Sequence, residues 1–270
     1  MIMMRLHLFV GIIGLAVLVL TAGARAEDAP ALTRHALGGS IGLRGDAVRD
    51  DLLVPLAFAG PGLQFLAFYR GWIGPGVLNA RADLGVAIVF NRFGHPGLTM
   101  SYGALADWTL TVLRANTWHI SLGPALALDS RESVLLSWDD AHGYWLGSQW
   151  LGPAARFMGQ VSSTWRLEAS AAMALVGFES RPPSYRYKKQ ETRPGVGFLF
   201  TQPEQSEKLV MLDQLQVFRL ELALRRATYN RFDVGRGWAF GLDFRMASTT
   251  TPATNINLSA CLFAGRSWGL

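Results

Sequence analysis

The sequence predicts an all-β fold, a single closed antiparallel up-and-down transmembrane β-barrel of about ten strands, with twelve as the alternative. Three observations predict it. Hydrophobic residues make up 50% of the 270-residue chain, yet after residue 26 no apolar run reaches the roughly 18 residues of a membrane helix. Apolar and polar residues alternate in several separate windows, as in strands with two unlike faces. Short and long connections alternate between these windows, as in barrels that cross a membrane.

The N-terminal segment is typical of a signal peptide. Arg5 precedes an apolar run from Leu8 to Leu20, and small residues with an A-x-A cleavage pattern follow it. The run is shorter than the roughly 20 residues that span a bilayer as a helix. We therefore expect residues 1–26 to be a signal peptide cleaved after Ala26, and residues 27–270 to form the barrel domain.

Alternation is clearest between Leu78 and Phe90, where the even positions are apolar. The odd positions include Asn79, Arg81 and Asp83. Because side chains of a strand alternate between its faces, one face is apolar and the other is polar. The same split recurs in residues 98–112, 117–128, 155–165, 167–178, 218–225 and 238–246.

Ten strands are predicted from these windows and from the turn residues between them. They are residues 35–45, 62–73, 78–92, 98–113, 117–128, 154–165, 167–178, 208–226, 232–246 and 254–268. An even number returns the C-terminus to the periplasmic side. Residues 133–138 and 195–201 are candidates for additional or extended strands, which would make twelve.

The connections predict two unlike rims. Short links at residues 73–76, 114–116, 165–166 and 227–232 would form the periplasmic rim, and long extracellular loops are expected near 46–61, 129–153 and 179–207. Tryptophans on apolar phases near the short links predict an aromatic girdle at the periplasmic interface. They are Trp108, Trp118, Trp165, Trp238 and Trp268.

The polar strand face predicts a charged and largely filled lumen. Lysine of the mature chain is confined to Lys188, Lys189 and Lys208, whereas the strands carry arginine and carboxylate residues two positions apart. Arginine suits bidentate pairing in a confined, partly dehydrated interior, and about ten strands leave little open space. The predicted ion-pair network is Arg81, Asp83, Arg166, Glu168, Arg219, Glu221, Arg225, Asp243 and Arg245.

Over about residues 34–270 these features resemble the bacterial outer-membrane β-barrels as an architectural class. The last strand alternates through Leu258, Leu262 and Trp268, as such barrels do, although the chain ends on Leu270 rather than an aromatic residue. The resemblance implies a location in the bacterial outer membrane. It also implies contact with outer-membrane lipid and lipopolysaccharide, and with the barrel-assembly machinery during biogenesis.

Charge and cysteine content exclude several function classes. The formal charge of +5 falls to +3 without Arg5 and Arg25, because 23 basic residues then oppose 20 acidic ones. This balance argues against nucleic-acid binding. The single Cys261 excludes an intramolecular disulfide and a metal site built from several thiolates. The pairs Gly38-Gly39 and Gly235-x-Gly237 lack a strand-to-helix context for nucleotide binding, so we expect no cofactor and no metal.

Two constellations were weighed as catalytic sites, although no catalytic role is expected. Asp140-x-His142, with Asp50-Asp51, resembles the paired acids and Asp/His pair of omptin-type outer-membrane proteases. Here the two acids are adjacent and the loop order differs, so a polar loop over the barrel mouth is the simpler interpretation.

The second constellation is His119 and Ser121, with Glu132 further along. The lipid A deacylases of the outer membrane use a His, a Ser and a Glu that face the lipid, and the resemblance implies a hydrolase. His119 and Ser121 instead share the polar phase of their strand, which predicts packing inside the lumen.

A basic and aromatic loop is a possible binding surface for lipopolysaccharide phosphates or another anionic ligand. The alternative interpretation is a solvated, proline-stiffened external loop. Its candidate residues are Arg181, Tyr185, Arg186, Tyr187, Lys188 and Lys189.

Together these features predict an outer-membrane β-barrel with a side-chain-filled lumen and a structural or surface-binding role through its extracellular loops. The alternatives are a narrow channel for small solutes and an outer-membrane hydrolase of the protease or lipid A deacylase type. The sequence identifies no surface ligand.

Overall fold

The structure, a computed structural model, describes residues 34–51, 54–137, 140–181, 206–226, 237–250 and 254–270. This part of the chain forms twelve strands and no helix. The strands are β1 (His35–Asp50), β2 (Val54–Ile73), β3 (Gly76–Asn91), β4 (Pro96–Arg114), β5 (Trp118–Ser137), β6 (Asp140–Gln160), β7 (Trp165–Met173), β8 (Val176–Arg181), β9 (Ser206–Met211), β10 (Leu215–Arg226), β11 (Gly237–Thr249) and β12 (Asn255–Gly269).

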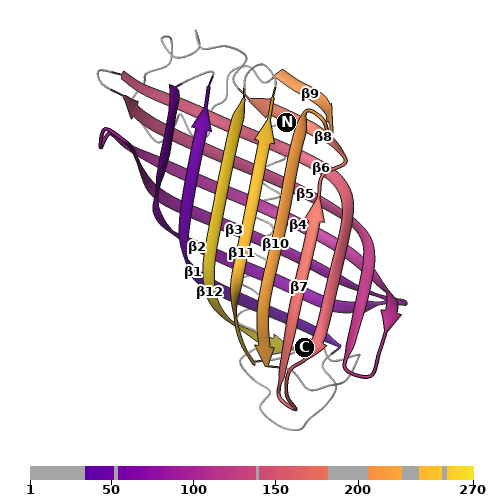
Figure 1. The fold of residues 1–270 in the computed structure, drawn as a ribbon. Coiled ribbons are helices and arrows are strands. Elements are labelled where there is room, and N and C mark those ends of the chain that lie inside the picture. The colour runs from indigo at the N-terminus through magenta and orange to yellow at the C-terminus, as the bar shows by residue number, and fades with distance from the viewer. Residues whose placement is uncertain (1–33, 52–53, 138–139, 182–205, 227–236, 251–253) are drawn as a thin grey trace.

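Ten of these strands form a closed antiparallel ring (Figure 1). Neighbours pair in the order β5-β4-β3-β2-β1-β12-β11-β10-β7-β6, and pairing of β5 with β6 closes the ring. The strands β8 and β9 lie outside it, because β8 pairs with β6 beyond the end of β7 and β9 pairs with β8. The predicted closed ten-stranded barrel is therefore confirmed.

The pairing register shows that the strands are strongly inclined. Paired residues can be followed from Glu132 on β5 through each neighbouring strand until the path returns to β5. The path returns at Ile120, twelve residues from its starting point. A shear of this size in a ten-stranded barrel corresponds to a tilt of roughly 40°. The path runs through Met100, Val86, Leu63, Leu43, Leu262, Leu242, Leu222, Ala169 and Phe157.

Short turns form the rim at which β1 begins and β12 ends, here called the terminal rim. Residues 74–75, 115–117 and 161–164 connect the strands there. Gly74 has a φ of 60°, which glycine adopts without steric cost. The turn predicted at 165–166 is wrong by a few residues, because the Ser162 hydroxyl accepts hydrogen bonds from the backbone N–H groups of Thr164 and Trp165 and holds the turn before β7.

Two of the predicted long loops are strands. Residues 46–50 and 54–61 belong to β1 and β2, and most of 129–153 belongs to β5 and β6, which pair up to Ser137 and Asp140. The prediction was wrong because the outward alternation stops being apolar at Ser130 and Glu132, although the backbone ladder continues past both. Apart from strand residues at its two ends, the third loop, 179–207, lies outside the described residues, as does 195–201.

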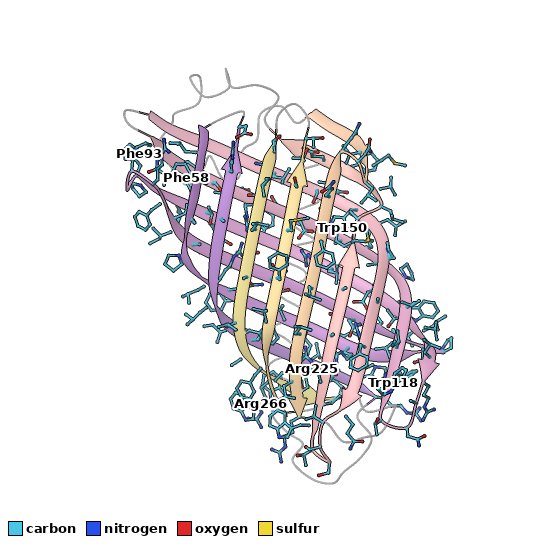
Figure 2. All side chains as sticks on the ribbon, in the orientation of Figure 1. Phe58, Phe93, Trp118, Trp150, Arg225 and Arg266 are labelled. Atoms are coloured by element: carbon cyan, nitrogen blue, oxygen red, sulfur yellow. The ribbon has the colours of Figure 1, made fainter. Side chains whose placement is uncertain are left out.

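The outer wall is apolar, and aromatic residues are concentrated near its terminal rim. Figure 2 shows Trp118 and Arg266 close to this rim, and the Trp238 ring stacks on Phe240 at 6.2 Å there. The predicted girdle positions Trp108, Trp165 and Trp268 also lie on outward phases of strand ends near this rim. Amphipathic aromatic rings favour the level of lipid head groups.

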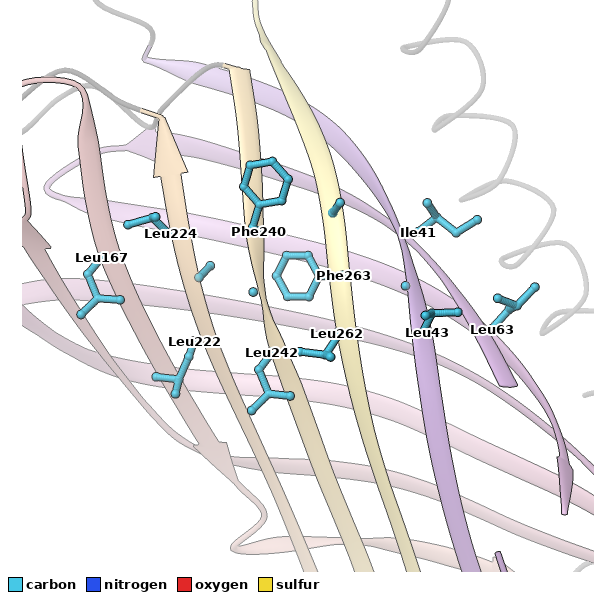
Figure 3. A pocket seen from close by; sticks show the side chains of 14 residues that line it. Ile41, Leu43, Leu63, Leu167, Leu222, Leu224, Phe240, Leu242, Leu262 and Phe263 are labelled. Atoms are coloured by element: carbon cyan, nitrogen blue, oxygen red, sulfur yellow. The ribbon is translucent and has the colours of Figure 1, made fainter. Parts of the chain in front are cut away.

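Leucines dominate the middle of the outer wall. Leu43 and Leu262 are 71% and 66% exposed, and together with Leu222 and Leu242 they line a shallow apolar depression (Figure 3). Membrane hydrocarbon that covers such a side chain stabilises it by about 1.5 to 3 kcal/mol relative to exposure to water. The outer wall therefore fits a lipid environment. Among the described residues, no helix has the length and apolar character to cross a membrane.

Candidate functional site

The lumen is the candidate functional site, because arginine and carboxylate side chains cross it from opposite walls. Arg219 on β10 is 1% exposed, forms an ion pair with Asp129 on β5 and lies 3.7 Å from Asp83 on β3. Arg81 on β3 donates to Glu221 on β10 at 2.9 Å. Because β3 and β10 are five strands apart in a ring of ten, these contacts join opposite sides of the barrel.

A second crossing lies closer to the terminal rim and centres on Glu168. Its carboxylate accepts from Arg70 and Arg166 at 2.6 Å and from Arg225 at 2.9 Å. Arg70 stands on β2 and Glu168 on β7, again five strands apart. The Arg225 guanidinium also donates to Glu221 at 2.6 Å, which connects this crossing to the first.

Polar neighbours complete the network. The Arg156 guanidinium donates to Asn79 at 2.7 Å and to Asp107 at 2.8 Å. Arg245 donates to Asp243 at 2.6 Å and forms an ion pair with Asp83. All nine residues of the predicted network therefore take part in ion pairs. We call this network, together with Arg70, Asn79, Asp107, Asp129 and Arg156, the charged level.

Above the charged level, a smaller polar group lies beside β1. Arg44 and Arg131 both contact Asp46, at 2.6 Å and 3.2 Å, and Arg131 also donates to Asn257 at 3.1 Å. These residues come from β1, β5 and β12. The group extends the cross-lumen pairing towards the rim opposite the termini, here called the distal rim.

One side of the lumen, formed by β1, β2, β3, β5 and β6, carries an apolar cluster near the distal rim. Phe58, Val89 and Leu135 are at most 1% exposed and lie within a few residues of the distal ends of β2, β3 and β5. Figure 2 shows Phe58 near this rim. We call this cluster the apolar level, and its members are Val48, Phe58, Ala87, Val89, Leu135 and Leu146.

Trp150 on β6 links the charged interior to apolar packing on one side of the lumen. Its ring is 1% exposed and packs in a second cluster with Leu105, Leu215 and Val217. The indole N–H donates to Asp129 at 2.9 Å, and Asp129 in turn pairs with Arg219. One tryptophan therefore both fills lumen space and donates to a half-buried carboxylate.

Between these contacts lies a small cavity. The cavity among the charged-level arginines measures about 40 Å³, which is room for about one or two water molecules. The buried charges of this network are tolerated because each faces an opposite charge. The arrangement suits a filled interior.

The structure separates the members of the proposed His, Ser and Glu site. Ser121 faces the lumen, where its hydroxyl lies 3.3 Å from that of Thr111. His119 shares this inward phase, two residues away. Glu132 stands on the outward phase of the same strand and accepts a hydrogen bond from the Tyr102 hydroxyl at 2.9 Å. The deacylase-like triad is therefore wrong, because alternation sends the carboxylate to the opposite face of the wall.

The Asp140-x-His142 candidate stays untested. The backbone of β6 places Asp140 opposite Ser137 and His142 opposite Leu135 at the distal rim, but their side chains lie outside the described residues. Of the two acids on the first loop, Asp51 pairs with Arg49 at 2.7 Å. Searching the described residues finds no group of His, Cys, Asp and Glu that could hold a metal.

The predicted binding loop is also beyond what the structure describes. Arg181 is the last residue of β8, and its backbone pairs with Ser206. Residues 185–189 lie outside the described residues. The lipopolysaccharide-binding prediction for this loop therefore stays a prediction.

Sequence reasoning missed Asp46, Asp129, Arg131 and Trp150 because it assigned them to loops. A signal for three of them was present in β5 and β6. Ala125, Ala127, Asp129, Arg131 and Ser133 keep one inward phase without a break, and Trp150 continues the matching phase of β6. Following the inward phase alone would have extended both strands.

Comparison with known proteins supports the barrel fold. The outer membrane protease OmpT from Escherichia coli is similar over 90% of this chain and 99% of that chain, with 8% identity and a TM-score of 0.50. The translocator domain of the autotransporter NalP from Neisseria meningitidis matches over 96% and 95%, with 8% identity and a TM-score of 0.43. The β domain of the Bordetella autotransporter BrkA matches over 87% and 100%, with 12% identity and a TM-score of 0.38. No protein-family model and no curated protein matches the sequence.

Proposed function

We propose that this chain, which has the fold of the bacterial outer-membrane β-barrels, is an occluded barrel that acts through its surface, in a structural or surface-binding role. The observation that carries the proposal is the crossing of the lumen by Arg81–Glu221 and Arg70–Glu168 at 2.9 Å and 2.6 Å. A solute would have to break these buried pairs. Removing one partner of such a pair costs about 3 to 5 kcal/mol.

The apolar level supports the same conclusion independently. Phe58, Val89 and Leu135 enter the lumen from three different strands near the distal rim. Ions and sugars gain no hydrogen-bond partners from these side chains, so passing them costs part of the hydration of the solute. The alternative of a narrow channel for small solutes would therefore require two separate rearrangements, one at each level.

The turn between β3 and β4 supports a surface role. It projects Phe93, which is 48% exposed, and the Arg92 guanidinium lies 4.6 Å from the centre of the Phe93 ring. Phe90 and Leu98 are exposed on the strand ends next to this turn. This patch at the distal rim combines apolar area with a cation, a combination that suits the head-group level of an anionic lipid layer. We propose contact with outer-membrane lipid and lipopolysaccharide there.

Conductance in a planar lipid bilayer tests the occluded lumen. The refolded protein, shown to be folded by its faster gel migration before boiling, should give no stable conductance steps. A general porin in the same bilayer is the positive control. Stable steps from the folded chain would overturn the proposal and establish the channel alternative.

A further inference from the structure

A small cavity in the lumen, lined by charged residues together with apolar side chains such as Phe68 and Leu105, has the features of a ligand site. It measures about 40 Å³ and lies among Arg70, Arg81, Arg156 and Arg225, with Asp107 and Glu221 also in its lining. These residues stand on β2, β3, β4, β6 and β10, five of the ten strands of the ring. Such a position is fixed by the whole barrel.

Two guanidinium groups of this lining have an unused donor. The Nε–H groups of Arg81 and Arg156 are buried, and neither has a hydrogen-bond partner among the described residues. Their side chains are 9% and 4% exposed. Leaving a buried donor unsatisfied costs about 1 to 3 kcal/mol, and more for charged groups. Both donors belong to residues that line the same cavity.

Positive charge exceeds negative charge around the cavity. Its lining holds four guanidinium groups against the two carboxylates of Asp107 and Glu221. Glu168 and Asp243 pair with three of these arginines from outside the lining and bring the local count to four against four. The charged level as a whole still holds seven guanidinium groups against six carboxylates. Uncompensated buried charge is costly, so a negative ligand would be stabilised here more than a neutral one.

We propose that this cavity binds one small monovalent inorganic anion of about the size of chloride. The anion accepts hydrogen bonds from the Nε–H groups of Arg81 and Arg156 and offsets the excess positive charge of the lining. A water molecule would satisfy the donors but would leave that charge. The volume excludes large organic anions. The site is independent of whether the barrel conducts.

Crystallography with bromide in place of chloride tests the site directly. We expect an anomalous peak inside the cavity, within hydrogen-bond distance of Arg81 and Arg156. Solvent density in the cavity without an anomalous peak would overturn the proposal in favour of water.

A solution experiment separates specific binding from occupancy at crystal concentrations. The urea midpoint of the folded barrel is compared in sodium chloride and in sodium gluconate at equal ionic strength. Gluconate is too large for the cavity, so the midpoint should be higher in chloride, because a ligand that binds only the folded state stabilises it.

Two conservative variants make the solution result specific. Arg156→Lys keeps a positive charge beside Asp107 but has no Nε–H donor, and it should lose most of the chloride effect. Arg44→Lys changes a lumenal arginine in the separate group beside Asp46, and it should keep the effect. Equal midpoints of the wild type in both salts, or an undiminished chloride effect in Arg156→Lys, would overturn the proposal.

Discussion

The charged level and the apolar level of the lumen differ in what surrounds them. At the charged level, the wall outside carries Leu43, Leu222 and Leu262, and the inside carries ion pairs. Towards the distal rim, the outward positions of β5 and β6 become polar at Ser130, Glu132 and Gln149, while the inside of this part of the barrel carries the apolar level. In this part of the barrel, the polarity of the wall therefore reverses.

This reversal follows from the solvent on the outside. Where the wall faces lipid, outward apolar side chains cost nothing and the polar phase must turn inward. Where the wall rises beyond the lipid, outward residues meet water and the hydrophobic effect favours an apolar interior, as in a soluble barrel. The patch at Phe90, Phe93 and Leu98 departs from this rule, which is the reason for the proposal that it contacts lipid.

Breaking the charged level should have the largest effect. Arg219→Met removes the partner of Asp129 and leaves Asp83 with one guanidinium fewer. Because buried carboxylates are then uncompensated, we expect a loss of about 3 to 5 kcal/mol in the free energy of unfolding. Urea titration of the refolded barrel, followed by tryptophan fluorescence, measures it.

The matched control is an ion pair outside both levels. Arg49 and Asp51 pair at 2.7 Å at the distal rim, where the Arg49 side chain is 53% exposed. Arg49→Met should therefore cost less than about 1 kcal/mol. Equal losses in the two variants would show that the charged level is solvated and open.

The ring of ten strands could be predicted because alternation is a local signal. Each strand shows the alternation of apolar and polar residues in its own sequence, as residues 78–90 and 98–112 do. The upper parts of β5 and β6 were harder to predict, because only the inward phase of the alternation continues there. Glu132 stands on the phase that is apolar elsewhere, so the apolar phase ends although the pairing with Met100 on β4 continues.

The composition of the network could be predicted, but its partners could not. Arg166 and Glu168 bond as near neighbours on one strand, at 2.6 Å. Arg81 and Asp83 have the same spacing, yet Arg81 pairs with Glu221 and Asp83 pairs with Arg245. Which residues meet across the lumen depends on the shear of the closed ring, and no local pattern encodes that register.

Breaking the apolar level should have a smaller effect. Leu135→Ala leaves a cavity beside Phe58 and Val89, and we expect a loss of about 3 kcal/mol. The adjacent outward substitution Val134→Ala is the control, because it removes methyl groups at the same height without opening the interior. If both variants lose the same free energy of unfolding, the apolar level is not a packed core.

The smallest expected effect concerns Trp150, whose ring fills lumen space and whose N–H meets the charged network. Trp150→Phe keeps an aromatic ring among Leu105, Leu215 and Val217 but removes the hydrogen bond to Asp129. We expect a loss of about 1 to 2 kcal/mol, since one lone pair of the half-buried Asp129 carboxylate loses its donor. The outward Trp238→Phe, which leaves the lumen unchanged, is the control in the same urea titration.

Because Asp129 also pairs with Arg219, the double variant Trp150→Phe/Arg219→Met should lose less than the sum of the two single losses. Strict additivity would mean that the indole only fills space and that the charged network ends at Asp129.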